Sequence, residues 1–341
     1  MDRKLKPINE QVMVITGSDS GIGLATARMA CRAGARVVLN SRDGEALERI
    51  AGELRESGGE AAWHAADVAD EHGMKRLAEV ALEQFGRIDT WVNNAGATVY
   101  GEIEKVPVDD ARRVFDTNYF GVVNGTLAAL PHLRREGGVL INVGSILSGV
   151  AIPLQGHYAA SKHAIKGFTD SLRQELEHDD APVAVSLIRP ASIDTPYTEH
   201  AHNHMEGAEP TVPPPVYAPE VVAEAILNCA ENPQREVLVG GSARQMEMMA
   251  GASPSLYDWY SETIVWDQQR AEPGTTQRND TLHGPSTSGS TRGSYDGHVM
   301  QSSMYTRARQ HPVQALMGVG AVGAGLYLLT RPAVMDRLMR G

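Results

Sequence analysis

Seven short runs of apolar, mainly β-branched residues recur over residues 11–242, and helix-forming stretches separate them. Strands that alternate with helices build parallel sheets, because each helix returns the chain to the same end of the sheet. The helices then cover both faces, which accounts for runs that are continuously apolar. The pattern therefore predicts an α/β fold with one doubly wound parallel sheet of about seven strands. The expected strands span residues 12–16, 35–40, 61–68, 89–95, 138–144, 183–190 and 235–241.

A glycine-rich turn follows the first expected strand and opens a helix. The stretch "VITGSDSGIG" places Gly17, Gly21 and Gly23 between residues 14 and 23. Residues without a side chain let the backbone approach a pyrophosphate, and the first turn of a helix offers unpaired N–H groups and the positive end of its dipole. This strand, turn and helix predict a Rossmann-like dinucleotide-binding domain.

Tyr158 and Lys162 lie four residues apart in "YAASK", within a stretch that favours a helix. Residues at this spacing share one face of a helix, so both side chains can reach one small molecule. A phenol has a pKa near 10 and exchanges protons poorly at neutral pH, whereas a nearby ammonium favours the phenolate. An isolated pair of this kind is common on helix surfaces, but beside a cofactor site it predicts acid–base chemistry.

Five motifs together closely resemble the short-chain dehydrogenase/reductase family. They are "TGSDSGIG" (16–23), "NNAG" (93–96), Asn118, Ser145 and "YAASK" (158–162). They occur in the family's order and spacing, and the resemblance covers residues 8–242. It implies an oxidoreductase that exchanges a hydride between a nicotinamide cofactor and a carbonyl or alcohol substrate.

The resemblance also implies roles for the catalytic residues. Tyr158 would give a proton to a ketone oxygen during reduction and take it back during oxidation, and Ser145 would hydrogen-bond that oxygen. Lys162 would hold the nicotinamide ribose, and its charge, together with that of the oxidised nicotinamide, would lower the pKa of Tyr158. Asn118 would complete a water-mediated proton relay to Lys162. An amide that merely bends its helix is the alternative for Asn118.

The stretch "VVLNSRD", at the end of the second expected strand, bears on the choice of cofactor. Enzymes that select NAD usually place an acid here for the ribose 2′-hydroxyl, whereas the 2′-phosphate of NADP needs a cation. The position of the acid holds Ser41 and Arg42 follows, so we expect NADP. Asp19 and Asp43 are the opposing signals and leave NAD as the alternative. The expected cofactor contacts are Gly17, Ser20, Gly21, Ile22, Gly23, Arg42, Asp67, Val68, Asn94, Ala95, Gly96, Tyr158, Lys162, Pro190, Ile193 and Thr195.

One residue near the expected nicotinamide site departs from the family pattern. Pro190 is followed by Ala191, where the family commonly has glycine. Alanine restricts this loop more than glycine does. Because Ile193 and Thr195 still match the positions that would bind the carboxamide, we expect the site to remain functional.

The histidines near the expected site carry no predicted role. His200, His202 and His204 alternate within "EHAHNHMEG" (199–207), a spacing that suits one face of a strand. This stretch lies where the family has a mobile substrate lid, and no cysteine or paired carboxylate completes a metal site there. His157 precedes Tyr158 and would point about 100° away from it on a helix. We therefore predict no metal and no catalytic histidine.

Composition excludes several classes of protein. The net charge is −11, so a nucleic acid is not an expected partner. The two cysteines, Cys31 and Cys229, fall in expected helices, which favours a reducing compartment over a disulfide framework. No apolar run of signal-peptide length precedes the first strand. We expect a cytoplasmic protein that acts on a small molecule and forms a homo-oligomer.

The chain changes character after residue 250. We expect a catalytic domain over residues 1–250, an accessory helix over 251–271, a flexible, disordered linker over 272–304 and an apolar tail helix with basic flanks over 305–341. Trp259 and Trp266 of the accessory helix favour packing on the core or on a second subunit, with a place in the substrate pocket as the alternative. The linker is rich in Gly, Ser, Thr and Pro, and it offers almost no apolar side chain for burial.

The expected tail helix contains an uncharged run of 18 residues, 313–330. As a helix this run would be about 27 Å long, just short of the roughly 30 Å hydrocarbon core of a bilayer. The residues from Gly274 onward carry a net charge near +4, which suits anionic headgroups. We expect membrane contact through this run, with docking on the domain and disorder as the alternatives.

The leading hypothesis is an NADP-dependent carbonyl reductase or alcohol dehydrogenase with a moderately apolar substrate. One alternative is a nucleotide-sensing protein that has lost turnover, and another is a membrane-linked scaffold. The complete set of Asn118, Ser145, Tyr158 and Lys162 argues against lost turnover. Residues 191–216 should shape the substrate pocket, but loops of this kind do not identify the substrate.

Overall fold

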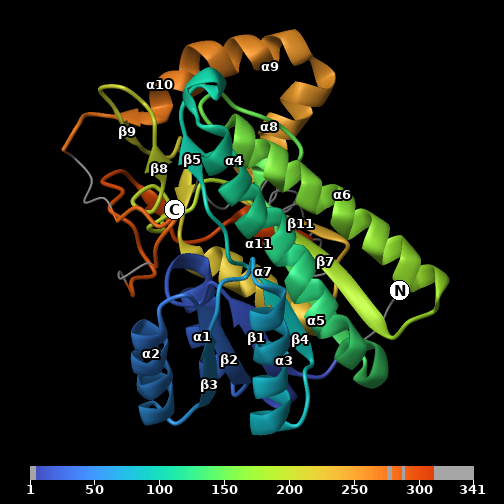
Figure 1. Ribbon diagram of the computed structural model, residues 1–341. Coiled ribbons are helices and arrows are strands. Elements are labelled where there is room, and N and C mark those ends of the chain that lie inside the picture. The colour runs from blue at the N-terminus through green and yellow to red at the C-terminus, as the bar shows by residue number, and fades with distance from the viewer. Residues whose placement is uncertain (1–4, 275–278, 286–288, 311–341) are drawn as a thin grey trace, which may run out of the picture.

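The computed structural model describes residues 5–274, 279–285 and 289–310. Its main sheet has seven parallel strands in the order β3-β2-β1-β4-β6-β7-β11 (Figure 1). The α/β fold expected from the sequence is confirmed, and each expected run coincides with one of these strands. The strands are β1 (Val12–Thr16), β2 (Arg36–Ser41), β3 (Glu60–Ala65), β4 (Thr90–Asn93), β6 (Gly138–Val143), β7 (Val183–Pro190) and β11 (Glu236–Val239).

Alternating side chains of each strand build two cores, one on either face of the sheet. One core lies under α1 (Gly21–Arg32), α2 (Gly44–Glu56) and α7 (Pro219–Glu231), and includes Met13 and Ile15 of β1. The other lies under α3 (Glu71–Phe85), α5 (Gly121–Glu136) and α6 (Gly156–His178), and includes Val12 and Val14 (Figure 1). With both faces covered, the carboxyl ends of the strands and their loops are left to form a site.

Several short elements surround the carboxyl ends of the strands. Helix α4 (Val108–Phe115) continues through a π-helical turn, η3 (Asp116–Phe120), into α5. Strand β8 (His202–Asn203) pairs in parallel with β5 (Val99–Tyr100), and β12 (Arg270–Ala271) pairs antiparallel with β9 (Glu209–Pro210). The 3₁₀ turns are η1 (Ile8–Glu10), η2 (Ile103–Lys105) and η4 (Ile146–Ser148).

The expected accessory helix is interrupted. Helix α8 (Gly241–Ala252) ends before Ser253, and α9 (Pro254–Tyr260), the π-helical turn η5 (Ser261–Val265) and α10 (Trp266–Gln268) follow at one end of the molecule (Figure 1). Trp266 packs against a small buried cluster that includes Tyr100, whereas Trp259 is half exposed. Packing on the core therefore applies to Trp266 and not to Trp259.

The described part of the expected linker lies against the catalytic domain. Strand β13 (Val299–Met300) pairs in parallel with β10 (Val216–Tyr217), and α11 (Met304–Gln310) follows. Leu282 is 1% exposed within a cluster that includes Val99 and Val114. A few apolar side chains and backbone hydrogen bonds attach these residues to the domain, despite their low apolar content. We call residues 279–285 and 289–310 the C-terminal segment.

The remainder of the tail, residues 311–341, lies outside the described residues, and the run expected to contact a membrane lies within it. Over residues 5–274, 279–285 and 289–310, no helix combines the length and the apolar character that crossing a membrane requires.

Candidate active site

The turn after β1 needs residues without side chains. Gly17 and Gly21 have φ angles of +61° and +52°, in the left-handed region that favours glycine. A Cβ atom on Gly23 would lie 2.0 Å from the carbonyl oxygen of Gly17. The backbone therefore passes close to the N-terminus of α1, where N–H groups can bind a phosphate. This geometry fits the pyrophosphate of a dinucleotide.

A groove at the carboxyl ends of the strands brings most of the expected site together. Every expected cofactor residue except Gly23 lines it, and so does Ser145. Gly23 packs against the turn from behind, and Asn118 is fully buried and does not line the groove. Residues from the ends of β1, β2, β4, β6 and β7 thus converge at the point where the order of the strands reverses.

Tyr158 and Lys162 lie on the first turns of α6, beside the end of β6. Ser145 follows β6 and begins η4, where its hydroxyl oxygen accepts a hydrogen bond from the Leu147 N–H at 3.1 Å. Tyr158 and Ser145 both line the groove, and the Tyr158 ring centre lies 5.5 Å from that of Tyr197. The Lys162 ammonium lies 5.5 Å from the centre of the Tyr158 ring and donates to the Val143 carbonyl at 3.0 Å. The four-residue spacing thus places the phenol and the ammonium in one pocket.

Burial dominates the pKa values of this pair. It raises the pKa of Tyr158 to about 12, against the lowering effect of the hydrogen bonds with Tyr197 and Ser145. Burial also lowers the pKa of Lys162 to about 8. The resemblance implies that Lys162 lowers the pKa of Tyr158 together with the charge of the oxidised nicotinamide. Burial acts in the other direction, because it removes the phenol from water. A neutral phenol is the form that can give a proton to a ketone oxygen.

Asn118 is held within the π-helical turn η3 by three hydrogen bonds. Its side-chain oxygen accepts from the Ala97 N–H at 2.8 Å, and its amide donates to the Ala97 carbonyl at 3.0 Å and to the Ser161 hydroxyl at 2.9 Å. A Cβ atom on Gly96 would lie 3.4 Å from the Asn118 oxygen and 3.7 Å from the Lys162 nitrogen. These contacts hold the loop after β4 beside Lys162.

Arg42 is the cation at the end of β2. Its guanidinium donates to the Thr281 carbonyl of the C-terminal segment, and burial lowers its pKa. Burial also raises the pKa of nearby Asp19 to about 6 and, with the charge of Arg42, lowers that of His200 to about 4. Asp67 forms an ion pair with Arg113, so its charge is partly balanced. At neutral pH this end of the groove presents one arginine, a neutral histidine and the Asp19 carboxylate.

The groove also contains residues that were not named individually from the sequence, although Tyr197 lies within residues 191–216, which were expected to shape the substrate pocket. The Tyr197 hydroxyl is 2.9 Å from that of Thr98 and donates to the Gln155 side chain at 2.8 Å, and its ring lies 5.5 Å from that of Tyr158. Tyr100 is fully buried in the groove wall, and its hydroxyl has no hydrogen-bond partner among the described residues. Apolar side chains complete this wall, among them Ile146, Ile152, Met246 and Val265. These residues come from separate helices, strands and loops, and no local motif marks them.

Ala191 fits its position without strain. It lines the groove, and its N–H donates to the Val239 carbonyl at 2.9 Å. The non-glycine residues with positive φ in the described chain are Leu154 and Asp180, so Ala191 does not need the conformational freedom of glycine. The departure from the family pattern therefore leaves the loop intact.

Comparisons with known proteins agree with this geometry. A family model described as short chain dehydrogenase matches residues 11–206. An uncharacterized oxidoreductase of Bacillus subtilis, YxnA, is 44% identical over 326 residues, which cover 95% of this chain and 90% of that protein.

Two solved structures share the fold. An alcohol dehydrogenase from Thermococcus sibiricus complexed with 5-hydroxy-NADP is 28% identical with a TM-score of 0.59, and the match covers 67% of this chain and 95% of the other. A short chain dehydrogenase/reductase from Burkholderia phymatum in complex with NAD is 26% identical with a TM-score of 0.63, covering 79% and 99%. Both forms of the nicotinamide cofactor therefore occur among its structural neighbours.

Proposed function

The chain belongs to the short-chain dehydrogenase/reductase family of NAD(P)-dependent oxidoreductases, and from that premise we propose that it transfers a hydride between NADP(H) and a carbonyl or secondary alcohol substrate. The observation that carries the proposal is the position of Tyr158, which lines the groove together with Ser145 and has the Lys162 ammonium 5.5 Å from the centre of its ring. A bound nicotinamide would supply or accept the hydride.

Tyr158 and the residues around it would transfer the proton that the substrate oxygen needs during reduction. During reduction, negative charge develops on the substrate oxygen, and Tyr158 gives its proton to that oxygen. Ser145 holds the same oxygen through its hydroxyl. Lys162 keeps the ribose in place and stabilises the phenolate that remains after the transfer. Asn118 holds the loop beside Lys162 and would connect Lys162 to solvent through a water.

Arg42 supports NADP as the cofactor. Its guanidinium is the cation at the end of β2 that lines the groove, where Ser41 replaces the usual acid. A guanidinium matches the geometry of a phosphate, which it can bind through two hydrogen bonds. The Asp19 carboxylate opposes a phosphate less than a typical aspartate would, because its raised pKa brings it closer to neutrality.

The wall formed by Ile146, Ile152, Met246 and Val265 supports a moderately apolar substrate. We therefore propose carbonyl compounds with an apolar body.

The test uses the purified full chain and a panel of apolar ketones, fatty-acyl thioester ketones, steroids and polyols, with consumption of NADPH and of NADH as the readouts. We expect turnover of apolar carbonyl compounds with NADPH preferred. Tight cofactor binding without turnover on any class would contradict the proposal and support a nucleotide-sensing protein.

Assembly and location are proposals that rest on residues outside the groove. We propose a cytoplasmic homo-oligomer that contacts a membrane through residues 313–330. Light scattering of the full chain tests the oligomer. Cell fractionation of the full chain and of a version ending at Gln310 tests the membrane contact, which is contradicted if both versions stay in the soluble fraction at low salt.

A further inference from the structure

Three imidazoles and two carboxylates meet outside the groove. Asp110 lies in the first turn of α4, His202 and His204 belong to the β8 region, and Asp280 and His283 come from the C-terminal segment. Residues 199–207 alone offer no completing carboxylate, which is why the sequence predicted no metal. Folding brings Asp110 from 92 residues earlier in the chain and two further residues from beyond residue 279.

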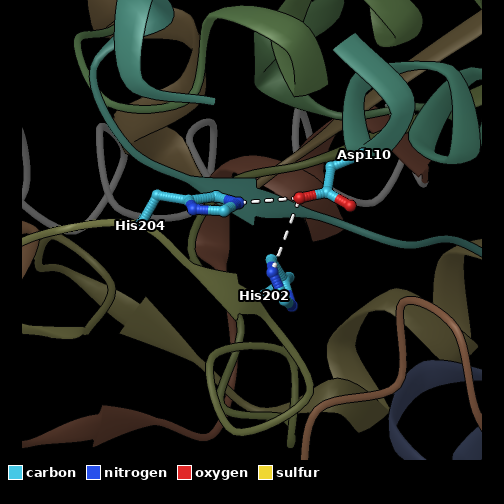
Figure 2. A group of neighbouring side chains, drawn as sticks. All are labelled: Asp110, His202 and His204. Carbon is cyan, nitrogen blue, oxygen red and sulfur yellow. Dashed lines mark hydrogen bonds and ion pairs between the residues drawn. The ribbon is translucent and has the colours of Figure 1, made fainter. Parts of the chain in front are cut away.

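The potential ligand atoms converge on the Asp110 carboxylate. The Nε2 atom of His204 lies 2.8 Å from Oδ2, that of His202 lies 3.5 Å from the same oxygen, and that of His283 lies 2.9 Å from Oδ1. Ligand atoms of Asp110, His202 and His204 all lie within 4.8 Å of one another. Figure 2 shows both of these imidazoles directed at one carboxylate. Ligands at about 2.0 Å from a tetrahedral zinc ion are themselves about 3.3 Å apart, so a small shift of these side chains would admit an ion.

The backbone holds the two neighbouring histidines in position. The His202 N–H donates to the Thr98 carbonyl at 3.2 Å, and the His204 N–H donates to the Tyr100 carbonyl at 2.7 Å. These bonds extend β8 along β5, so residues two apart direct their side chains to the same face. His200, which precedes the strand, instead lines the cofactor groove. Two of the three alternating histidines are therefore placed as one pair.

The Asp280 carboxylate accepts a hydrogen bond from Nδ1 of His202. A proton on Nδ1 leaves a lone pair on Nε2, and Nε2 is the atom that faces Asp110. A carboxylate that holds the second nitrogen of a ligating histidine is the usual arrangement around protein-bound zinc. The cluster thus has both a candidate set of ligands and an outer partner that sets the tautomer of one of them.

We propose that His202, His204, His283 and Asp110 bind a divalent transition-metal ion of the zinc class, with Asp280 as the outer partner of His202. Three imidazoles and one carboxylate form a donor set that suits Zn²⁺ and its neighbours better than Mg²⁺ or Ca²⁺. The Asp110 side chain is 13% exposed and that of His283 is 58% exposed, so an ion can enter from the His283 side.

The ion would join three segments that are distant in sequence. Thr281, which accepts a hydrogen bond from Arg42, lies between Asp280 and His283. A metal at this position would therefore attach the C-terminal segment to α4 and to the β8 region beside the cofactor groove. We expect it to be structural, since four protein ligands leave no open position for chemistry.

The test is a binding measurement on the full chain, prepared without a polyhistidine tag, stripped with EDTA and dialysed. Zn²⁺ binding is followed by metal analysis and by the thermal midpoint, and Co²⁺ binding by visible absorption. We expect one ion per chain, a tetrahedral Co²⁺ spectrum and a higher midpoint with Zn²⁺. Asp280→Asn should weaken binding about 10–100-fold, as loss of an outer partner does, and His204→Asn should weaken it more.

His178→Asn, at the exposed end of α6, is the matched control and should bind Zn²⁺ as the unaltered chain does. If His204→Asn fails to fold by circular dichroism, His202→Gln and Asp110→Asn replace it. Absence of a stoichiometric ion in the unaltered chain, or equal affinity in all ligand variants, would overturn the proposal. In that case the cluster is a set of histidine–carboxylate hydrogen bonds without a metal.

Discussion

The start of α6 and the C-terminal segment line the same groove, but their contacts are built differently. Tyr158 and Lys162 are positioned by one helix, whose geometry places residues four apart on one face. The C-terminal segment reaches the groove through backbone carbonyls, with Thr281 accepting from Arg42 and Ser290 accepting from the Gly21 N–H at 2.9 Å. The first arrangement depends on residues four apart in the sequence. The second depends on pairs of residues more than 230 positions apart.

Because the two regions are built differently, turnover and cofactor affinity can be altered separately. The local arrangement contains the groups that move a proton, so its variants should change turnover. The C-terminal segment meets the groups expected to hold the phosphates of the cofactor, so its variants should change cofactor affinity at constant turnover. Three kinetic measurements test that division, and one measurement of stability tests the burial of Lys162.

The largest effect is expected at Tyr158. Tyr158→Phe removes the transferable proton and keeps the ring packed against Tyr197, so turnover should fall on the order of 10²-fold or more with NADPH affinity nearly unchanged. Steady-state kinetics and cofactor fluorescence measure the two quantities. Tyr305→Phe, on α11 and outside the groove, should leave turnover intact. Near-normal turnover of Tyr158→Phe would mean that Tyr158 does not supply the proton and that catalysis does not depend on the start of α6.

The second effect concerns Arg42, where the two regions touch. Arg42→Asp exchanges a phosphate partner for a carboxylate that can accept from a ribose hydroxyl, so the ratio of kcat/KM for NADPH to that for NADH should fall about 10–100-fold. Arg112→Asp, an exposed residue of α4, is the control and should leave the ratio unchanged. A protein that already prefers NADH would contradict the assignment of Arg42.

The seven-stranded sheet and the residues of the groove were predictable because their signals are local. Apolar runs predict buried parallel strands, and the turn at Gly17 to Gly23 lies wholly between β1 and α1. The wall of Tyr100, Gln155 and Tyr197 was not predictable residue by residue. A short strand, the N-terminal end of α6 and a loop supply it, and each residue is ordinary in its own surroundings.

The attachment of the C-terminal segment and the group of Asp110, His202, His204, Asp280 and His283 were not predicted, for a related physical reason. Low apolar content indicates that a segment cannot form its own core, but it does not exclude attachment to another one. Leu282 helps to anchor residues 279–285, since its side chain enters a cluster that includes residues of β5 and α4. Likewise, the alternation of His202 and His204 predicted a strand face, yet the carboxylate that completes the group lies in a helix far from them in sequence.

The third prediction tests the burial of Lys162 through the pH dependence of stability. Because its pKa is lowered to about 8 from 10.5, the unfolded chain binds more protons than the folded protein between these pH values. Its contribution to the free energy of unfolding is therefore least favourable below pH 8 and improves as pH rises through this window.

Lys162→Met removes this titration while keeping an unbranched side chain. Urea unfolding of both proteins at pH 7.5 and pH 10 gives the difference between them, in which shared titrations cancel. We expect the unaltered protein to gain about 1–3 kcal/mol relative to the variant between the two pH values. A constant difference would mean that the lysine keeps the same proton affinity folded and unfolded.

The smallest effect is expected at Leu282, which anchors the C-terminal segment. Removing most of a buried leucine side chain costs about 2–5 kcal/mol where the site cannot collapse, but β13 and the ion pair of Arg292 with Glu220 also attach this segment. Leu282→Ala should therefore loosen residues 279–285 without detaching the whole segment.

Because the Thr281 carbonyl is hydrogen-bonded to Arg42 in the attached form, we expect the KM for NADPH to fall about two- to fivefold at unchanged kcat. We also expect faster proteolysis near residue 282. Leu256→Ala, half exposed on α9, is the matched control. A higher KM in Leu282→Ala would instead mean that Thr281 forms part of the binding surface for the cofactor, and the two regions would then act as one site.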